Sequence, residues 1–147
     1  MSAIPAAQDG LAALLAADAT VGPYFLGIGW PVPDPPLSDA VWIDGHISDR
    51  KSTDLTTGLG ERSEEETFTV RVQVHCSRAT ALFTDVRTVL MAYLLAIEEA
   101  IEVDRTLAVA PNFDCTSAAG DIHDFLLAPG AGRGAACHVD IFCTALT

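Results

Sequence analysis

Strict alternation of apolar and polar residues marks the clearest element of the chain, residues 67–76. A period of two predicts a strand with one buried and one polar face. The same alternation returns near the end of the chain, over residues 136–145. The side chains expected to point inward are Phe68, Val70, Val72, Val74 and Cys76 in the first strand, and Cys137, Val139, Ile141 and Cys143 in the second.

A helical period predicts two helices, over residues 2–17 and 78–104. The apolar stripe of the second consists of Leu82, Val86, Val89, Leu90, Tyr93, Leu94, Ile97 and Ile101. On its opposite face, Met91 and Leu95 interrupt an otherwise polar row. Two exposed apolar residues are often without consequence, but they can also mark a subunit contact.

The remaining segments predict shorter elements. Residues 41–47 and 107–117 are expected to be strands, and residues 121–127 a short strand or a turn of helix. Residues 22–39 contain five prolines, which exclude a helix and a central strand, so they are expected to form a connector. Residues 48–65 are polar, and so long a loop in a compact domain is usually disordered alone or functional.

Together these elements predict one α+β domain over residues 1–147. It comprises a mostly antiparallel four-stranded sheet with a long extended hairpin loop, covered on one face by two helices. The hairpin carries a polar assembly loop at about residues 48–66.

The charge balance narrows the possible partners. The net charge is -12, from 20 acidic and 8 basic residues. This balance argues against wrapping nucleic acid, which needs clustered Lys and Arg, although an acidic surface can lie beside DNA without sticking to it. The simpler interpretation is an acidic, soluble domain.

No secretory signal or membrane-spanning run is recognisable, so synthesis in the cytoplasm and no membrane partner are expected.

Candidate chemistry is sparse. The four cysteines form no CxxC pair and are expected to be small buried residues. Arg71, His75, His138 and Asp140 could share one polar sheet face, which could do acid–base chemistry, face solvent or meet another subunit. No phosphate loop, metal motif or nucleophile motif is present. We therefore predict no catalytic residue, no cofactor and no metal site.

Acidic residues crowd the C-terminal end of the long helix, where the helix dipole disfavours negative charge. Either these carboxylates lie on a solvent-exposed surface that tolerates them, or cations from a neighbouring copy pair with them. Closed head-to-tail rings use such contacts between unlike patches. The candidate interface residues are Arg50, Lys51, Arg62, Glu64, Met91, Leu95, Glu98 and Glu102, next to Glu99 and Asp104.

The order and spacing of several short motifs resemble the tail terminator proteins of long-tailed bacteriophages. The motifs are Gly29-Trp30-Pro31, Val41-Trp42-Ile43, Arg62-Ser63-Glu64-Glu65-Glu66 before Phe68-Thr69-Val70, and Asp104-Arg105-Thr106-Leu107 after the long helix. The resemblance covers nearly the whole chain.

This resemblance implies a structural protein of the virion, at the head-proximal end of the tail. It implies a hexameric ring that caps the tail tube, stops its polymerisation, and contacts the tail tube protein and the head-completion (stopper) protein. DNA would cross its lumen without specific binding, and neither catalysis nor a cofactor is implied. Two alternatives stay open: another head–tail connector or neck component, and a small α+β enzyme or ligand-binding module that uses the polar sheet face.

Overall fold

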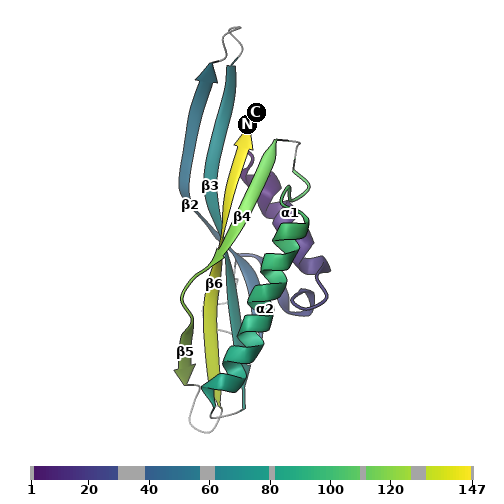
Figure 1. Ribbon diagram of the computed structural model, residues 1–147, viewed down its shortest axis with the longest axis vertical. Coiled ribbons are helices and arrows are strands. Elements are labelled where there is room, and N and C mark those ends of the chain that lie inside the picture. Colours follow the sequence, from purple (N-terminus) through teal and green to yellow (C-terminus); the bar gives the residue numbers. More distant parts are fainter. Residues whose placement is uncertain are drawn as a thin grey trace.

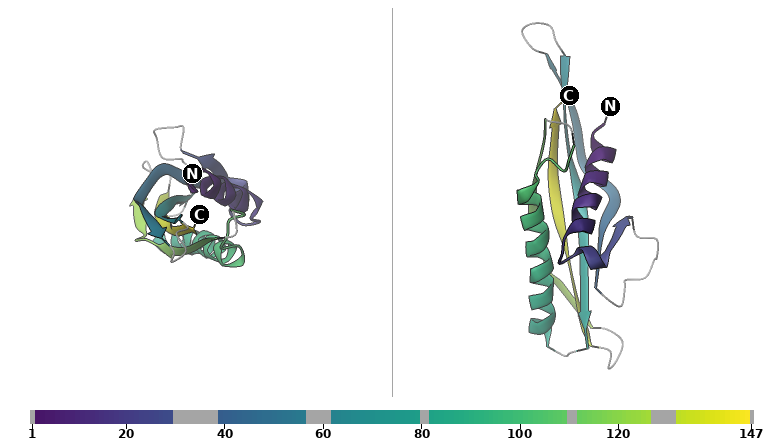
Figure 2. Two further views of the ribbon diagram at one scale, coloured as in Figure 1. Left: turned by 90° about the horizontal axis from the view of Figure 1, so that it is seen from above. Right: turned by 90° about the vertical axis from the view of Figure 1, so that its right-hand side faces the viewer.

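Two helices cover one face of a strongly twisted sheet (Figure 1). The computed structural model describes residues 2–29, 39–56, 62–79, 82–109, 112–126 and 132–146. Within them the sheet has six strands, and Figure 2 shows both helices on the same side of it. The predicted α+β class and the one-sided helical cover are confirmed.

Five of the strands follow one another across the sheet in the order β1-β2-β3-β6-β4. β5 pairs with the start of β6, and β4 with its second half. Among the strand pairs of the described residues, only β1–β2 is parallel. The elements are α1 (Ile4–Ala17), a 3-10 turn (Gly22–Tyr24), β1 (Phe25–Ile28), β2 (Ala40–Thr56), β3 (Arg62–Arg78), α2 (Phe83–Val103), β4 (Phe113–Ala119), β5 (His123–Leu126) and β6 (Arg133–Leu146).

The core lies between the sheet and the helices, as the two periods predict. Val70, Val72 and Val74 of β3 have no exposed surface, and neither do Val139 and Ile141 of the neighbouring β6. The buried residues of α2 are Val86, Leu90, Tyr93, Leu94, Ile97 and Ile101, six of the eight residues in the predicted stripe. Alternation and helical spacing therefore identified the buried faces correctly.

The predicted number of four strands was too low. β1 lies inside the segment expected to be only a connector, where it forms a four-residue edge strand. An edge strand this short gives too few positions for a visible alternation. The predicted start of the next strand, at residue 107, was also early. Leu107 and Ala108 have positive φ angles of 48° and 56°, so the chain still turns there, and β4 begins at Phe113.

The expectation of a loop at about residues 48–66 was wrong, although the extended hairpin is confirmed. β2 continues to Thr56 and β3 begins at Arg62, and the two strands pair as far as Thr56 with Arg62. This pairing holds polar residues on both faces, so no hydrophobic period reveals it. Residues 57–61, between the two strands in the sequence, lie outside the described residues.

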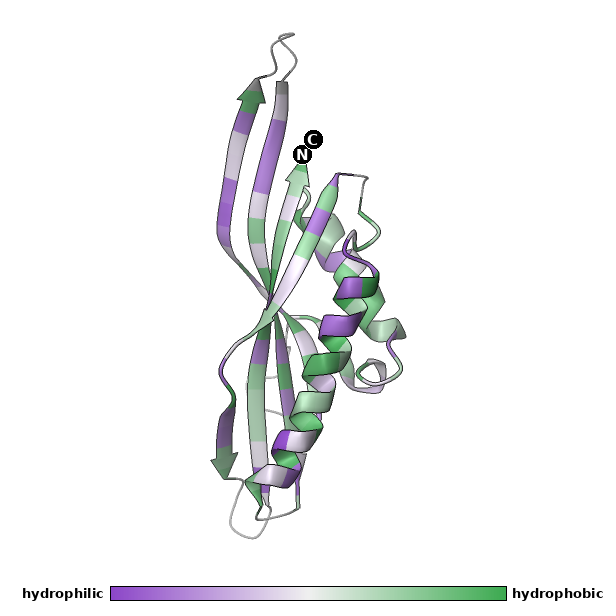
Figure 3. Cartoon of the chain, in the orientation of Figure 1, coloured by the Kyte–Doolittle hydropathy of each residue, from purple (hydrophilic) through white to green (hydrophobic). Residues whose placement is uncertain are grey.

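We call residues 51–56 of β2 and 62–66 of β3 the arm. β6 ends opposite Glu65, and beyond that point β3 pairs only with β2 in the described part of the chain. The arm projects past the rest of the molecule in Figures 1 and 2 and is mostly hydrophilic in Figure 3. The outer part of the arm, residues 54–56 and 62–64, is a two-stranded ribbon with no core of its own, whereas Glu65 and Glu66 at its base still pair with β6. The direction of the outer part therefore depends on how this base is anchored.

Gly10 allows α1 to pack against the turn after α2. A Cβ built at Gly10 would lie 1.9 Å from the Leu107 carbonyl oxygen. The side chain of Leu107 is itself buried. The glycine therefore sets the distance between the first helix and the end of the second.

We expect Gly10→Ala to lower the free energy of unfolding by about 1–3 kcal/mol, because the backbone oxygen cannot move aside without displacing the turn. This net loss already includes the gain of about 1 kcal/mol from alanine's helix propensity. Urea denaturation measures the difference. Gly45→Ala is the matched control, since nothing lies within 4 Å of its added Cβ. A Gly10→Ala variant as stable as the wild type would contradict the close packing.

Candidate assembly surfaces

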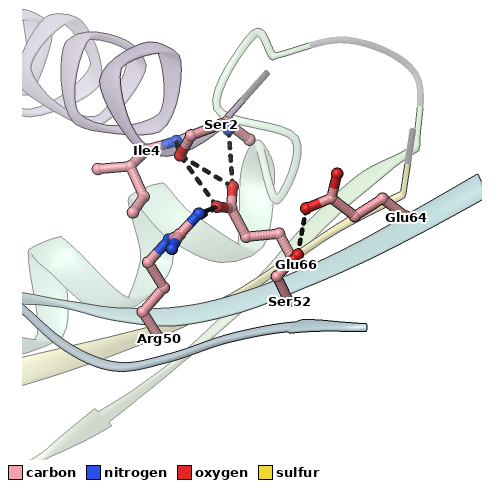
Figure 4. Close-up of polar contacts among 7 residues, drawn as sticks. Ser2, Ile4, Arg50, Ser52, Glu64 and Glu66 are labelled. Atoms are coloured by element: carbon pink, nitrogen blue, oxygen red, sulfur yellow. Dashed lines mark hydrogen bonds and ion pairs between the residues drawn. The ribbon is translucent and has the colours of Figure 1, made fainter. Parts of the chain in front are cut away.

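Glu66 lies where the arm leaves the body, and its side chain is only 5% exposed. The backbone N–H of Ala3 donates to its Oε1 atom at 2.7 Å. The hydroxyl of Ser2 lies 3.0 and 3.1 Å from the two carboxylate oxygens. Arg50 of β2 reaches Oε2 with Nε at 3.0 Å and with Nη2 at 2.9 Å (Figure 4). One carboxylate thus joins β2, β3 and the residues that begin α1.

The environment of Glu66 favours its charged form. Burial raises the pKa of the Glu66 carboxyl, but the hydrogen bonds from Ala3, Ser2 and Arg50 outweigh burial and hold the pKa below its usual value. The start of α1 also favours a negative charge through the helix dipole. Arg50, predicted as a cation for a neighbouring copy, is therefore already paired within its own chain.

Glu64, another predicted interface residue, lies farther out on the same face of the arm. Its carboxylate accepts a hydrogen bond from the hydroxyl of Ser52 on the opposite strand (Figure 4). This bond ties the two strands together beyond Glu66. The side chain of Arg62 lies outside the described residues.

A groove of about 440 Å³ lies between the middle of α2 and the segment that links β4 to β5. Met91 and Leu95, predicted as possible contacts, form part of its wall and are 50% and 54% exposed. Half-buried Glu98 lies at the same groove. The full lining is Met91, Ala92, Leu94, Leu95, Glu98, Ala119, Gly120 and Ile122. We call this feature the α2 groove.

The acidic residues of the helix end do not form one site. Glu98 faces the α2 groove, and Glu99 lies in a depression between α1 and α2. Glu102 lines a third, smaller depression with Arg105. The last turn of α2 contains no basic residue, and Arg105 pairs with Asp114 of β4 at 2.6 Å. These carboxylates therefore face different depressions, because the helix turns them in different directions, and a pairing of any of them with cations of a neighbouring copy stays a prediction.

Most cations of the chain are paired internally. Arg87 lies over the ring of Phe83, with 5.8 Å between the guanidinium carbon and the ring centroid. Within the described residues Lys51, on the arm, is exposed and has no ion pair. The ion pairs of the others are Arg50–Glu66, Arg71–Asp140, Arg78–Asp39, Arg105–Asp114 and Arg133–Asp124.

The predicted polar sheet face exists, but it divides into two parts. Arg71 and Asp140 are paired at 2.8 Å, and His138 Nε2 lies 3.8 Å from the same carboxylate. His75 lies farther along β3, between the rings of Trp42 and Phe125 at 5.1 and 6.0 Å. Burial lowers the pKa of His75, so its imidazole favours the neutral form. This arrangement separates His75 from the carboxylate that would position an acid–base pair.

The cysteines are poor nucleophiles. All four are buried and free, and burial raises the pKa of Cys76 and of Cys115 to about 11.

The described residues contain no group of three or more His, Cys, Asp or Glu that could hold a metal ion. Neither helix in this part of the chain is long and apolar enough to cross a membrane.

The role of Glu66 was not predicted, although its position in the sequence indicates that it is buried. Glu66 precedes Phe68 and Val70 by even steps, so it occupies an inward-facing position of β3. A charged residue in the buried phase of a strand implies a partner, because an unpaired buried charge is costly.

Comparisons with known proteins show the fold. No family model matches the sequence, and no curated protein matches it either. A solved structure described as "Virion of native gene transfer agent (GTA) particle" contains a similar chain, with a TM-score of 0.51 and 14% sequence identity. The match covers 98% of this chain and 96% of that one. The two chains therefore share one fold from end to end.

We expect Glu66→Gln to lower the free energy of unfolding by about 1–3 kcal/mol at neutral pH, because the buried partners lose a charged acceptor. The folded pKa of Glu66 is lowered, so its contribution is complete above the unfolded value of 4.5 and is lost as the pH falls through the folded pKa. The stability difference between wild type and variant should therefore shrink below about pH 4.5. Urea denaturation at several pH values measures it, and Glu65→Gln is the control. A difference that does not change with pH would contradict the assignment.

Proposed function

We propose that this chain is a structural protein of a virion and forms the tail terminator ring of a long-tailed bacteriophage. The observation that carries the proposal is the end-to-end fold likeness to a chain of a gene transfer agent virion. Because the match leaves almost none of either chain uncovered, the shared fold accounts for the whole length of both. The short motifs that resemble tail terminators favour the same interpretation.

The surfaces of the chain support an assembly role. The arm projects from the body without a core of its own, and the α2 groove exposes apolar side chains on an outer helix face. Two exposed apolar residues are ordinary on a monomer, but a two-stranded ribbon without a core gains stability from a partner that covers it. A ring subunit would use them to meet neighbouring copies, the tail tube protein and the head-completion protein.

The charge supports a channel that DNA crosses without binding. The net charge of -12 repels phosphates, and internal ion pairs occupy most of the cations. DNA that passes through such a ring would meet repulsion rather than a binding site. We propose no catalytic role and no cofactor.

Another head–tail connector or neck component is the second candidate. The similar chain belongs to a structure described as a virion, and that description gives no position within the particle. Both candidates assemble into the particle, but they act at different points. A terminator stops growth of the tail tube, whereas a neck component closes the filled head. Loss of the protein therefore gives different particles in the two cases.

Particles assembled without this protein should carry over-long tails or tails without heads, because nothing would stop polymerisation of the tube. Negative-stain electron microscopy of lysates from a deletion mutant measures tail length and head attachment. Supplying the protein in trans should restore the normal length. Tails of normal length beside leaking, DNA-poor heads would contradict the terminator and favour the neck component.

Removal of the arm should abolish assembly and leave the fold intact. In the variant, Asn-Gly replaces residues 53–65, which joins the paired residues Ser52 and Glu66 through a two-residue turn. The Glu66 anchor is kept, so the unfolding midpoint should change little. Rings or particle-bound copies, scored by electron microscopy, should disappear. Normal incorporation of the shortened protein into particles would contradict a role of the arm in assembly.

A further inference from the structure

The α2 groove sets two chemical requirements for an occupant. Met91 and Leu95 are half exposed and offer an apolar surface. Glu98 adds a half-buried carboxylate with no cation partner in the described residues. An occupant that satisfies both must bring an apolar side chain and a positive charge, since a half-buried carboxylate gains from a charged partner.

The arm offers this combination. Lys51 and Leu55 of β2 pair with Thr67 and Ser63 of β3, so both point to the same face of the ribbon. Lys51 is exposed, and Leu55 is 38% exposed. Their positions along the strand lie about 13 Å apart, at about 3.3 Å per residue. Met91 and Glu98 lie about 10 Å apart along α2, at 1.5 Å per residue. Flexible side chains bridge so small a difference.

Lys51 is the cation with a described side chain that is available to form an ion pair with Glu98. The other cations with described side chains are in ion pairs or, for Arg87, over an aromatic ring. An acidic subunit meeting another acidic subunit needs a cation at the contact, because like charges at an interface repel. Within the described residues, Lys51 is available without breaking an existing pair.

The two surfaces cannot meet within one copy. The arm projects from one end of the molecule, whereas the groove runs along the middle of α2 (Figure 1). A contact between them joins unlike patches of two copies. Such head-to-tail contacts close into rings when the rotation between copies allows it.

We infer that the arm of one copy docks in the α2 groove of the next. Leu55 packs against Met91 and Leu95, and the ammonium group of Lys51 pairs with the Glu98 carboxylate. This contact rests on the proposed function in one respect, that the protein works as many copies, and it identifies the surfaces through which those copies meet.

The composition of the chain permits a sharp test, because Lys51 is its only lysine. A carbodiimide joins an amine directly to a carboxylate that touches it, so every side-chain amine cross-link must involve Lys51. A mixture of unlabelled and nitrogen-15-labelled protein, cross-linked and digested, separates links between copies from links within one copy. We expect a mixed-isotope Lys51–Glu98 peptide in the mass spectrum.

Matched variants test the specificity of the link. Glu98→Gln should remove the mixed-isotope peptide, and Glu99→Gln on the same helix should keep it. Lys51→Arg should lose the cross-link and keep self-association, since the charge remains. A link from Lys51 to another carboxylate of the neighbouring copy, or links only within one copy, would overturn the docking site.

Charge reversal gives an independent measurement. Lys51→Glu and Glu98→Lys should each weaken self-association at least about tenfold in sedimentation velocity. The double variant should restore it, because the pair is re-formed with the signs exchanged. Circular dichroism checks that each variant folds. If the wild type associates and the double variant does not recover, the docking site is wrong while the terminator role, tested by tail length in mutant particles, is unaffected.

Discussion

The arrangement of the molecule depends on the buried carboxylate of Glu66. The arm has no hydrophobic core, so pairing between its two strands cannot by itself fix where it points. Glu66 fixes the base of the arm by accepting hydrogen bonds from the start of α1 and from Arg50 at the same time.

A second buried carboxylate, Asp39, acts in the same way at the start of β2. It receives hydrogen bonds from Arg78 of β3 and from Tyr93 of α2. The start of β2 and the base of the arm are thus both tied to the body by charged groups.

These anchors also determine the charge of the surface. Each of these two carboxylates pairs with an arginine, Arg50 or Arg78. Arg71 pairs across the sheet with Asp140, and Arg105, in the turn after α2, pairs with Asp114 of β4. The acidic excess is therefore left on the outside, where few positive charges accompany it. A surface of this kind repels DNA and also repels other copies of itself. In the proposed ring, assembly would therefore depend on apolar contacts and on cations that are not paired internally, such as Lys51 on the arm.

The sequence predicted the parts of the fold that a hydrophobic core imposes. The inward residues of β3 and β6 and the stripe of α2 were assigned correctly, because burial on one face forces a period on the sequence. The outer strands of the arm were missed because neither of their faces is buried, and the edge strand β1 was missed because it is too short to show a period. Of the candidate site, Met91, Leu95 and Glu98 do line one groove. Sequence could not show that Glu99 and Glu102 face elsewhere or that Arg50 is paired internally, because both depend on side-chain direction in the folded chain.

We propose that the exposed features of this chain serve to contact other copies of it within a virion. A cryo-electron-microscopy map of the intact particle tests that claim most directly. We expect a closed ring of this protein at the head-proximal end of the tail tube, with each arm lying across α2 of the adjacent copy. A particle in which the protein is absent, or present as single copies whose arms touch no neighbour, would contradict it.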